Sequence, residues 1–174
     1  HTVIPVRLKE LGVPTVSLDP GRSYMEPQFR ADLPAVLRGT AAFLPSYEEA
    51  RRLFLPREIS GWELAEAIGD MGSRVIVIKR GALGQLLWDQ QSHRRWLVPA
   101  YPSRVRDPHG AGDAYCGGFL VGLSETGDPL EAALRGSVSA SIVVEGTGAL
   151  YAMDCLPGLA QARLHSLRPA VKSA

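Results

Sequence analysis

The residues with the clearest chemical potential lie in the stretch DPHGAGDAYCGGF, residues 107–119. Gly110, Ala111 and Gly112 come directly before a carboxylate, Asp113. Glycine disfavours a helix interior by about 1 kcal/mol relative to alanine, so glycines at the start of a helical pattern need a reason. Backbone N–H groups at a helix start have no partner within the helix and bind anions, and glycine lets a ligand approach the backbone closely. The stretch therefore predicts an anion site.

A carboxylate beside that site has two interpretations. Asp113 would repel a bound phosphate, so its presence makes sense if it takes the proton from a hydroxyl that attacks the phosphorus. Alternatively, the stretch is only a glycine-rich turn with an acid in the first helical turn, which the helix dipole also favours. We assign Gly117 and Gly118 to close helix packing rather than to ligand contact.

The elements around this stretch predict an α/β fold in which helices cover a largely parallel sheet. We expect one sheet to contain the strands at 15–19, 41–44, 74–79 and 85–89, and a hairpin to join 85–89 to a strand from residue 94. Capping boxes at Ser46/Glu49 and Ser60/Glu63 predict two helix starts. Further helices are expected at 3–12, 28–39, 111–127, 129–146 and 155–167. A short strand at 103–106 would lead into the glycine stretch, which then lies at a strand's carboxyl end, where open α/β sheets bind ligands.

Composition excludes several classes of protein. The 174 residues carry a formal net charge of +1, which favours neither nucleic acid nor an anionic membrane surface. Cys116 and Cys155 have no metal-ligand spacing, and we expect a reduced, cytoplasmic protein. No dinucleotide fingerprint, Walker phosphate loop, metal cluster or G-x-S-x-G nucleophile elbow is present in the sequence. The length suits one packed domain, and because the chain opens at His1 on a helical pattern, we expect residues 1–174 to be part of a larger domain.

The stretch DPHGAGDAYCGGFLVGL resembles the signature of the ribokinase-like (PfkB) carbohydrate kinase family, D-T-x-G-A-G-D before a helix of small and aromatic residues. Other segments resemble that family in the family's order, from about residue 5 to about residue 165: VSLDPGRSYM, FLPSYEEARRLF, VIVIKRGALGQLLWD and SASIVVEGTGAL. The resemblance implies a three-layer sandwich with a mostly parallel sheet, an antiparallel hairpin edge and helices on both faces. It also implies that the family's N-terminal half, which carries sugar recognition and a strand lid, is missing from this chain.

The resemblance implies roles for individual residues. Asp113 would be the catalytic base, and the N–H groups of Gly110, Ala111 and Gly112 would form an anion hole. ATP and Mg²⁺ are the implied cofactors, with a monovalent cation such as K⁺ in some members. The remaining implied residues are Gly81, Gly84, Gly146, Gly148 and Ser46 for the nucleotide, Glu49 for magnesium and Asp107 for the monovalent cation.

Three residues depart from the family pattern. Pro108 replaces the family's threonine, which puts the cation site in doubt. Ser46 replaces an asparagine and has a shorter reach, and Gly21 replaces another asparagine, so Asp19 before it is left to end its strand. The capping box and a functional role for Ser46 and Glu49 are compatible.

We therefore expect an ATP-dependent kinase that phosphorylates a hydroxyl of a sugar or a nucleoside-like molecule. The acceptor cannot be read from this chain, which we expect to bind nucleotide weakly, or to be inactive, by itself. Two alternatives stay open: a non-catalytic nucleotide- or sugar-binding module with the kinase fold, and an unrelated doubly wound domain with a coincidental G-A-G-D. No nucleic acid or membrane partner is expected, and the sequence leaves a homo-oligomer open.

Overall fold

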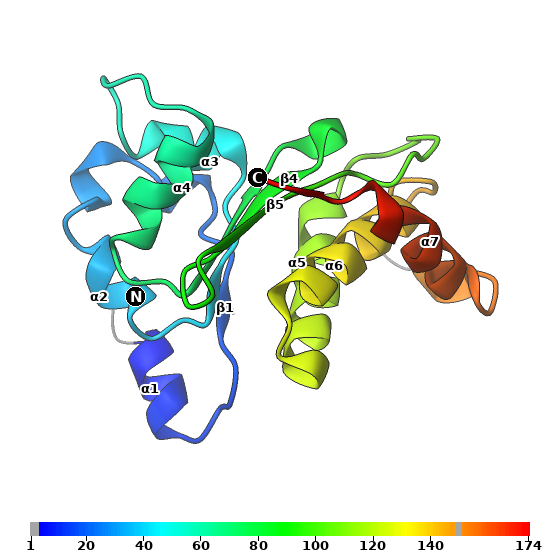
Figure 1. Ribbon diagram of the computed structural model, residues 1–174, viewed down its shortest axis with the longest axis horizontal. Coiled ribbons are helices and arrows are strands. Elements are labelled where there is room, and N and C mark those ends of the chain that lie inside the picture. Colours follow the sequence, from blue (N-terminus) through cyan, green and yellow to red (C-terminus); the bar gives the residue numbers. More distant parts are fainter. Residues whose placement is uncertain (1–3, 149–150) are drawn as a thin grey trace. The chain divides into compact units, whose positions relative to one another are not determined.

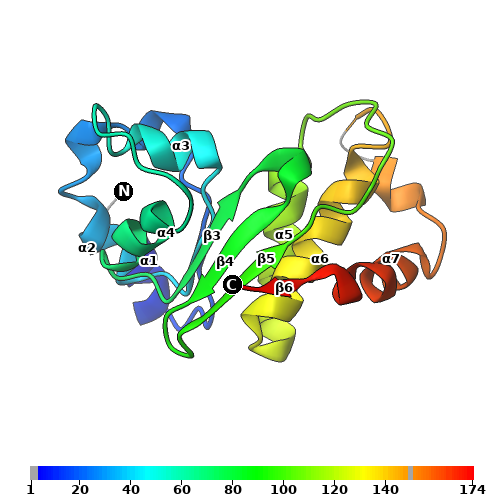
Figure 2. The ribbon, with the colours of Figure 1, turned by 45° about the horizontal axis from the view of Figure 1, so that its top comes forward.

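The chain divides into two compact units in the computed structural model, which describes residues 4–148 and 151–174. The first unit comprises His1–Arg80, Gln85–Arg95 and Ala174, and the second comprises Gly81–Gly84 and Trp96–Ser173. Figures 1 and 2 show the elements that each unit contains. Within the described residues, no helix combines the length and apolar character that crossing a membrane requires.

The first unit holds strands with both parallel and antiparallel neighbours. The strands are β1 (Ser17–Leu18), β2 (Ala42–Phe43), β3 (Val75–Lys79) and β4 (Gln85–Asp89). β1 pairs with β2 and β2 with β3 in parallel, whereas β3 and β4 are antiparallel. The four strands expected to share a sheet therefore do so, although β1 and β2 are shorter than expected. β2 and most of β3 are buried, with Phe43 and Ile76 fully so, as the apolar runs predict, whereas both residues of β1 are only partly buried.

Helices accompany these strands in the first unit. The α-helices are α1 (Ile4–Glu10), α2 (Leu33–Leu37), α3 (Tyr47–Arg52) and α4 (Gly61–Gly69), and short 3₁₀ turns η1 (Arg22–Tyr24) and η2 (Pro27–Phe29) precede α2. The helix expected over 28–39 carried an expected irregularity at Pro34, and the segment is indeed divided: Pro34 lacks an N–H and suits a first turn, so the α-helix begins only at Leu33. The expected helix over 3–12 includes residue 3, which lies outside the described residues.

Of the two expected capping boxes, only one forms. Ser46 and Glu49 make the full reciprocal box at the start of α3. Ser60 is the residue before α4, but its side chain makes no capping bond. Gly61, the first residue of α4, has a left-handed φ of +52°, whereas a capping box needs helical geometry there.

The second unit is mainly helical. It contains η3 (Gly81–Leu83), α5 (Ala111–Thr126), α6 (Pro129–Val143), η4 (Tyr151–Asp154), α7 (Leu159–Leu167), η5 (Arg168–Ala170) and β6 (Lys172–Ser173). β5 (Arg94–Val98) begins in the first unit and continues here, where Trp96 and Leu97 pair antiparallel with β6. Figure 2 shows α5, α6 and α7 next to one another in chain order. The helix at Ala111 starts within two residues of Gly112, as expected.

Two details of this unit differ from expectation. Residues 103–106 form no strand, because the segment turns to the end of α6 instead: Arg106 and Asp107 both donate their N–H groups to the Val144 carbonyl, at 2.8 and 3.2 Å. The last α-helix begins at Leu159 rather than at residue 155, after Gly158 in a left-handed conformation with φ +81°. Left-handed geometry there interrupts the helical path before the apolar pattern resumes.

Glycines set how closely α5 and α6 approach. A Cβ on Gly118 would meet the Arg135 carbonyl at 2.9 Å and the Ser139 side chain, and one on Gly136 would meet the Tyr115 carbonyl at 2.9 Å. By contrast, a Cβ on Gly117 would meet nothing within 4 Å. The packing role expected for both Gly117 and Gly118 is therefore confirmed for Gly118 and wrong for Gly117.

Candidate active site

The loop before α5 holds the candidate anion site in the second unit. Gly110 is the N-cap residue directly before α5, and its φ of +78° is left-handed, which favours glycine over residues with a Cβ. Space does not require glycine there, because a Cβ would only touch Val143 at 3.9 Å. No side chain caps the helix. The first-turn N–H groups of α5 are therefore not covered by a side-chain cap of the protein's own.

The backbone N–H groups around the start of α5 differ in whether they already have a hydrogen-bond acceptor. The Ala111 N–H already donates to the Pro108 carbonyl at 3.2 Å, which closes a turn. Gly112 and Asp113 are exposed in the first turn, where an α-helix supplies no acceptor for their N–H groups. Asp113 is the acidic residue of that turn. The loop therefore presents backbone donors and one carboxylate on an exposed surface.

Asp107 anchors the same loop through His109. The Asp107 Oδ1 atom accepts the His109 backbone N–H at 3.0 Å and lies 2.7 Å from the Nδ1 atom of the His109 ring. These two hydrogen bonds, the backbone one foremost, hold the pKa of the Asp107 carboxyl below its usual value, although partial burial opposes them. The second ring nitrogen is on an exposed side chain, since His109 is 93% exposed. Asp107 thus acts first as a turn-forming residue.

The four glycines expected at the nucleotide all belong to the second unit, but they fall into two kinds. Gly84 must lack a side chain because a Cβ would meet Pro99 Cα at 2.7 Å and the Val98 carbonyl, and Gly146 because one would meet the Tyr151 ring. Gly81 and Gly148 have φ values of +57° and +89° and open space around a built Cβ. Packing explains the first pair, and the second pair offers exposed backbone. Residues 149–150 of the expected adenine loop lie outside the described residues.

Ser46 and Glu49 lie in the first unit at the carboxyl end of the strands. The Glu49 Oε2 atom accepts the Ser46 backbone N–H at 2.8 Å and the Ser46 hydroxyl at 2.7 Å, and the Ser46 Oγ atom accepts the Glu49 N–H at 3.3 Å. Both side chains are half-buried. Among the residues that the structure describes, no three His, Cys, Asp or Glu side chains are grouped so as to hold a metal ion.

Sequence reasoning missed one ion pair at that same edge. The Lys79 ammonium, at the end of β3, donates to the Asp19 Oδ2 atom at 2.7 Å. The two residues are sixty positions apart, so spacing alone could not have revealed the pair. The available signal was a lysine at the end of a buried strand, directly before the Arg80–Gly81 turn.

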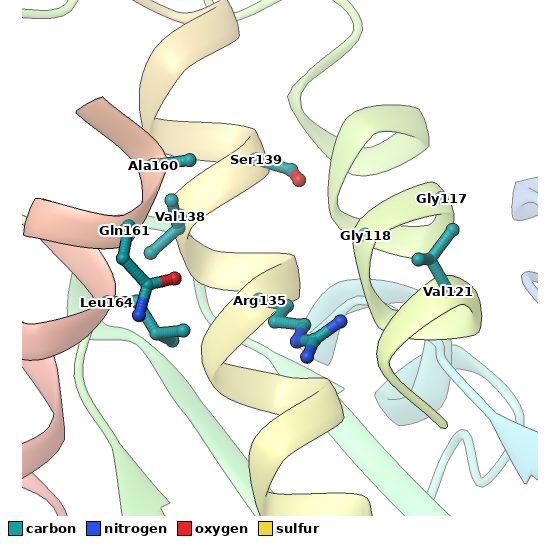
Figure 3. Close-up of a pocket in the computed structure, with 9 residues that line it drawn as sticks. All are labelled: Gly117, Gly118, Val121, Arg135, Val138, Ser139, Ala160, Gln161 and Leu164. Carbon is teal, nitrogen blue, oxygen red and sulfur yellow. The ribbon is translucent and has the colours of Figure 1, made fainter. Parts of the chain in front are cut away.

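A groove of about 470 Å³ is lined by residues of α5, α6 and α7 in the second unit (Figure 3). Gly117, Gly118 and Val121 of α5 form one side, and residues of α6 and α7 form the rest: Arg135, Val138, Ser139, Ala160, Gln161 and Leu164. Its lining includes neither Asp113 nor any residue of the loop before α5. The groove is therefore separate from the candidate site.

Comparison with known proteins places the chain in a family. The model of the pfkB family carbohydrate kinases matches residues 9–155. An uncharacterized sugar kinase of Archaeoglobus fulgidus is 33% identical over 135 residues, which cover 78% of this chain and 52% of that protein. A cytidine kinase of Thermococcus kodakarensis is 38% identical over 73 residues, 42% of this chain and 26% of that protein.

Solved structures agree on the fold. Arabidopsis thaliana ribokinase, complexed with ribose and ATP, superposes with a TM-score of 0.75 at 22% identity, over 94% of this chain and 51% of that one. A ribokinase-like protein from E. coli, in complex with ATP and Mg²⁺, gives 0.74 at 22% identity, over 92% and 52%. The fold is thus ribokinase-like, a mixed α/β fold, as expected. The chain belongs to the pfkB family of carbohydrate kinases, and it spans about half the length of the Archaeoglobus fulgidus relative and of the two solved structures.

Proposed function

We propose that this chain carries the nucleotide-binding and catalytic-base part of an ATP-dependent kinase that phosphorylates a hydroxyl of a sugar or nucleoside. The observation that carries the proposal is the start of α5, where a left-handed glycine replaces a side-chain cap and Asp113 lies exposed in the first turn. Membership of the carbohydrate kinase family supports the same reaction class.

In this proposal, the first turn of α5 binds the transferring phosphoryl group. The N–H groups of Gly112 and Asp113, together with that of Gly110, stabilise negative charge on its oxygens, and the helix dipole adds to their effect. The acceptor hydroxyl oxygen attacks the γ-phosphorus, and the bond from that phosphorus to the β–γ bridging oxygen breaks, which releases ADP. Asp113 takes the hydroxyl proton, a role worth about 10²–10⁴-fold in rate. Alignment and charge stabilisation supply the remainder.

Magnesium fits the residues present. Mg²⁺ is usually held by one or two carboxylates and the substrate phosphates, with water completing its shell, so it needs no dedicated protein cage. Glu49 is a half-buried carboxylate whose Oε2 atom is committed to Ser46, and it would hold the ion, with Ser46 beside the nucleotide. Magnesium supplies charge neutralisation between the phosphates when bound.

Asp107 is less suited to bind a monovalent cation than Glu49 is to bind magnesium. Its Oδ1 atom already accepts the backbone N–H of His109 and contacts the His109 ring, and the neighbouring Pro108 has replaced a hydroxyl-bearing residue of the family pattern. The proposal therefore includes ATP and Mg²⁺ but no K⁺-dependent step.

The acceptor class comes from the relatives, which include a sugar kinase and a cytidine kinase. We place the protein in the cytoplasm, with a small-molecule substrate and without a nucleic acid or membrane partner. The alternative is a non-catalytic nucleotide- or sugar-binding module with the same fold. Asp113 favours the kinase, since a binding module has no hydroxyl proton to remove and a carboxylate beside phosphate repels it.

The proposal is tested by titrating the chain with ATP and Mg²⁺ while backbone amide signals are followed by NMR. We expect the largest changes at Gly110–Asp113, with smaller ones at Gly81 and Gly148, and weak affinity. Phosphoryl transfer from γ-labelled ATP to a panel of sugars and nucleosides is then measured on the natural polypeptide that contains these residues. Perturbation confined to other segments, or the absence of transfer to any of the acceptors, would contradict the proposal.

A further inference from the structure

The carboxyl ends of β1 and β3 carry an ion pair that the proposed function does not yet use. Asp19 directly follows β1, and Lys79 is the last residue of β3, with β2 between the two strands. The Lys79 Nζ atom donates to the Asp19 Oδ2 atom at 2.7 Å. The two side chains are 15% and 31% exposed. A cation and its counter-ion therefore lie at the end of the parallel strands, the edge at which open α/β sheets bind ligands.

Lys79 is also tied to the proposed nucleotide residues of the first unit. Its backbone N–H donates to the Pro45 carbonyl at 2.9 Å, and it forms an isolated parallel bridge with Ser46. Ser46 is in turn bonded to Glu49. One serine hydroxyl, two carboxylates and one ammonium therefore share this edge.

The chemistry of the pair suits an exchange of partners. A lysine ammonium is a compact charge on a flexible four-carbon stem, which binds phosphate as a point charge. A mostly buried ammonium needs a counter-ion in the absence of ligand, and Asp19 supplies one. Because Asp19 is twice as exposed as Lys79, its carboxylate can return to water at little cost when another anion takes its place.

We propose that Lys79 is a nucleotide-binding residue whose ammonium leaves Asp19 and binds a phosphate oxygen of ATP. Asp19 is then the counter-ion of the nucleotide-free protein and competes with the phosphate for Lys79. This inference rests on the proposed function, because it assumes that ATP binds beside Ser46. It adds a positively charged side chain to the two residues of the first unit already proposed to act at the nucleotide, Ser46 and Glu49.

The competing explanation is purely structural. The pair could serve only to join the ends of two strands, in which case both partners would matter for stability and neither for nucleotide affinity. Three variants of the chain separate the explanations: Lys79→Met, Asp19→Asn and, as a control, Lys9→Met. The control makes the same substitution and the same charge change at an exposed position of α1.

Each variant is titrated with ATP and Mg²⁺ and, separately, with adenosine, which lacks phosphate. We expect Lys79→Met to weaken ATP binding about tenfold, the effect of one hydrogen bond between charged groups, and to leave adenosine binding unchanged. Asp19→Asn should strengthen ATP binding, and Lys9→Met should change neither ligand. In the unsubstituted chain, the NMR signal of the Lys79 side chain should shift with ATP but not with adenosine, a measurement that needs no variant to fold.

The outcomes distinguish a failure of the inference about Lys79 from a failure of the proposed function. If the unsubstituted chain binds ATP and Lys79→Met binds it equally well, or if the Lys79 signal responds alike to ATP and adenosine, the inference about Lys79 is overturned and the proposed function stands. If both Lys79→Met and Asp19→Asn lower the melting temperature without any change in ATP affinity, the pair is structural. If the unsubstituted chain binds no ATP, both the proposed function and this inference fail.

Discussion

The starts of α3 and α5 both place an acid near helix N–H groups, yet they differ in what satisfies those groups. At α3, the Ser46 hydroxyl accepts the Glu49 N–H, and the Glu49 carboxylate accepts the Ser46 N–H. At α5, Gly110 offers no side chain, and Asp113 stays exposed. The first helix start is closed by the protein's own side chains, whereas the second is open to an external anion.

The positive end of a helix dipole can be satisfied by the protein's own carboxylate, as at α3, or left available to a bound anion, as at α5. Carboxylates are favourable near any helix N-terminus, so an acid there is by itself no evidence of function. Because the N-cap of α5 is Gly110 rather than serine, the helix loses roughly a few tenths of a kcal/mol of capping stability, which must be offset elsewhere. For α5, the contact with α6 provides that stability, because Gly118 and Gly136 let the two helices approach closely.

The first prediction, with the largest expected effect on stability, tests whether packing rather than capping holds α5. Gly118→Ala should lower the free energy of unfolding by about 1–3 kcal/mol, because the new methyl group would meet the Arg135 carbonyl and Ser139. The matched control is Gly117→Ala, where open space and better helix propensity should stabilise by up to about 1 kcal/mol. Urea unfolding of both variants gives the two values. Equal effects at the adjacent positions would show that this packing does not support α5.

The second prediction concerns the closed helix start. Ser46→Ala should lower the free energy of unfolding by about 1 kcal/mol, since it removes an N-cap from α3. Ser60→Ala is the control, and we expect only a small change because the Ser60 side chain makes no capping bond. Thermal melts of the two variants at the same pH provide the measurement. A larger loss at Ser60 would reverse our assignment of the two caps.

The third prediction is a small pH effect at the loop before α5. The pKa of Asp107 is lowered in the folded state by the His109 N–H and ring, so its ionised form stabilises the fold above the unfolded pKa of about 4. That contribution is lost as the pH falls through the lowered folded pKa. Asp107→Asn should therefore melt at a slightly lower temperature than the unsubstituted chain at pH 7, and the difference should shrink below about pH 4. A difference that is constant across this range would show that ionisation of Asp107 does not contribute.

Local features of this fold could be predicted from the sequence because local chemistry fixes them. The capping box at Ser46, the buried strand at β3 and the start of α5 follow from residues within a few positions of each other. Two predictions were wrong where adjacent residues did not determine the structure. Residues 103–106 form no strand, since Arg106 bonds to the carbonyl at the end of α6, and Gly61 prevents a second capping box.

The candidate site also has parts that the sequence predicts and parts that it does not. The G-A-G-D loop could be predicted because its members are adjacent in the chain. The Lys79–Asp19 pair could not, since strand pairing alone brings the two residues together. The packing requirement for glycine at position 146 could not be predicted either, because it comes from the Tyr151 ring, which the fold places where a Cβ would be.

The most direct test of the central claim, that the open start of α5 performs chemistry, is paired kinetics and nucleotide titration of Asp113→Asn. Measured on the natural polypeptide that contains these residues, its turnover number should fall at least 10²-fold, the low end expected for loss of a general base. Nucleotide affinity should hold or improve, because a negative charge beside the phosphate is removed. Asp128→Asn, the same substitution at the capped start of α6, should leave both quantities unchanged. If Asp113→Asn keeps the unsubstituted turnover number, Asp113 is only a first-turn helix acid, and the claim is wrong.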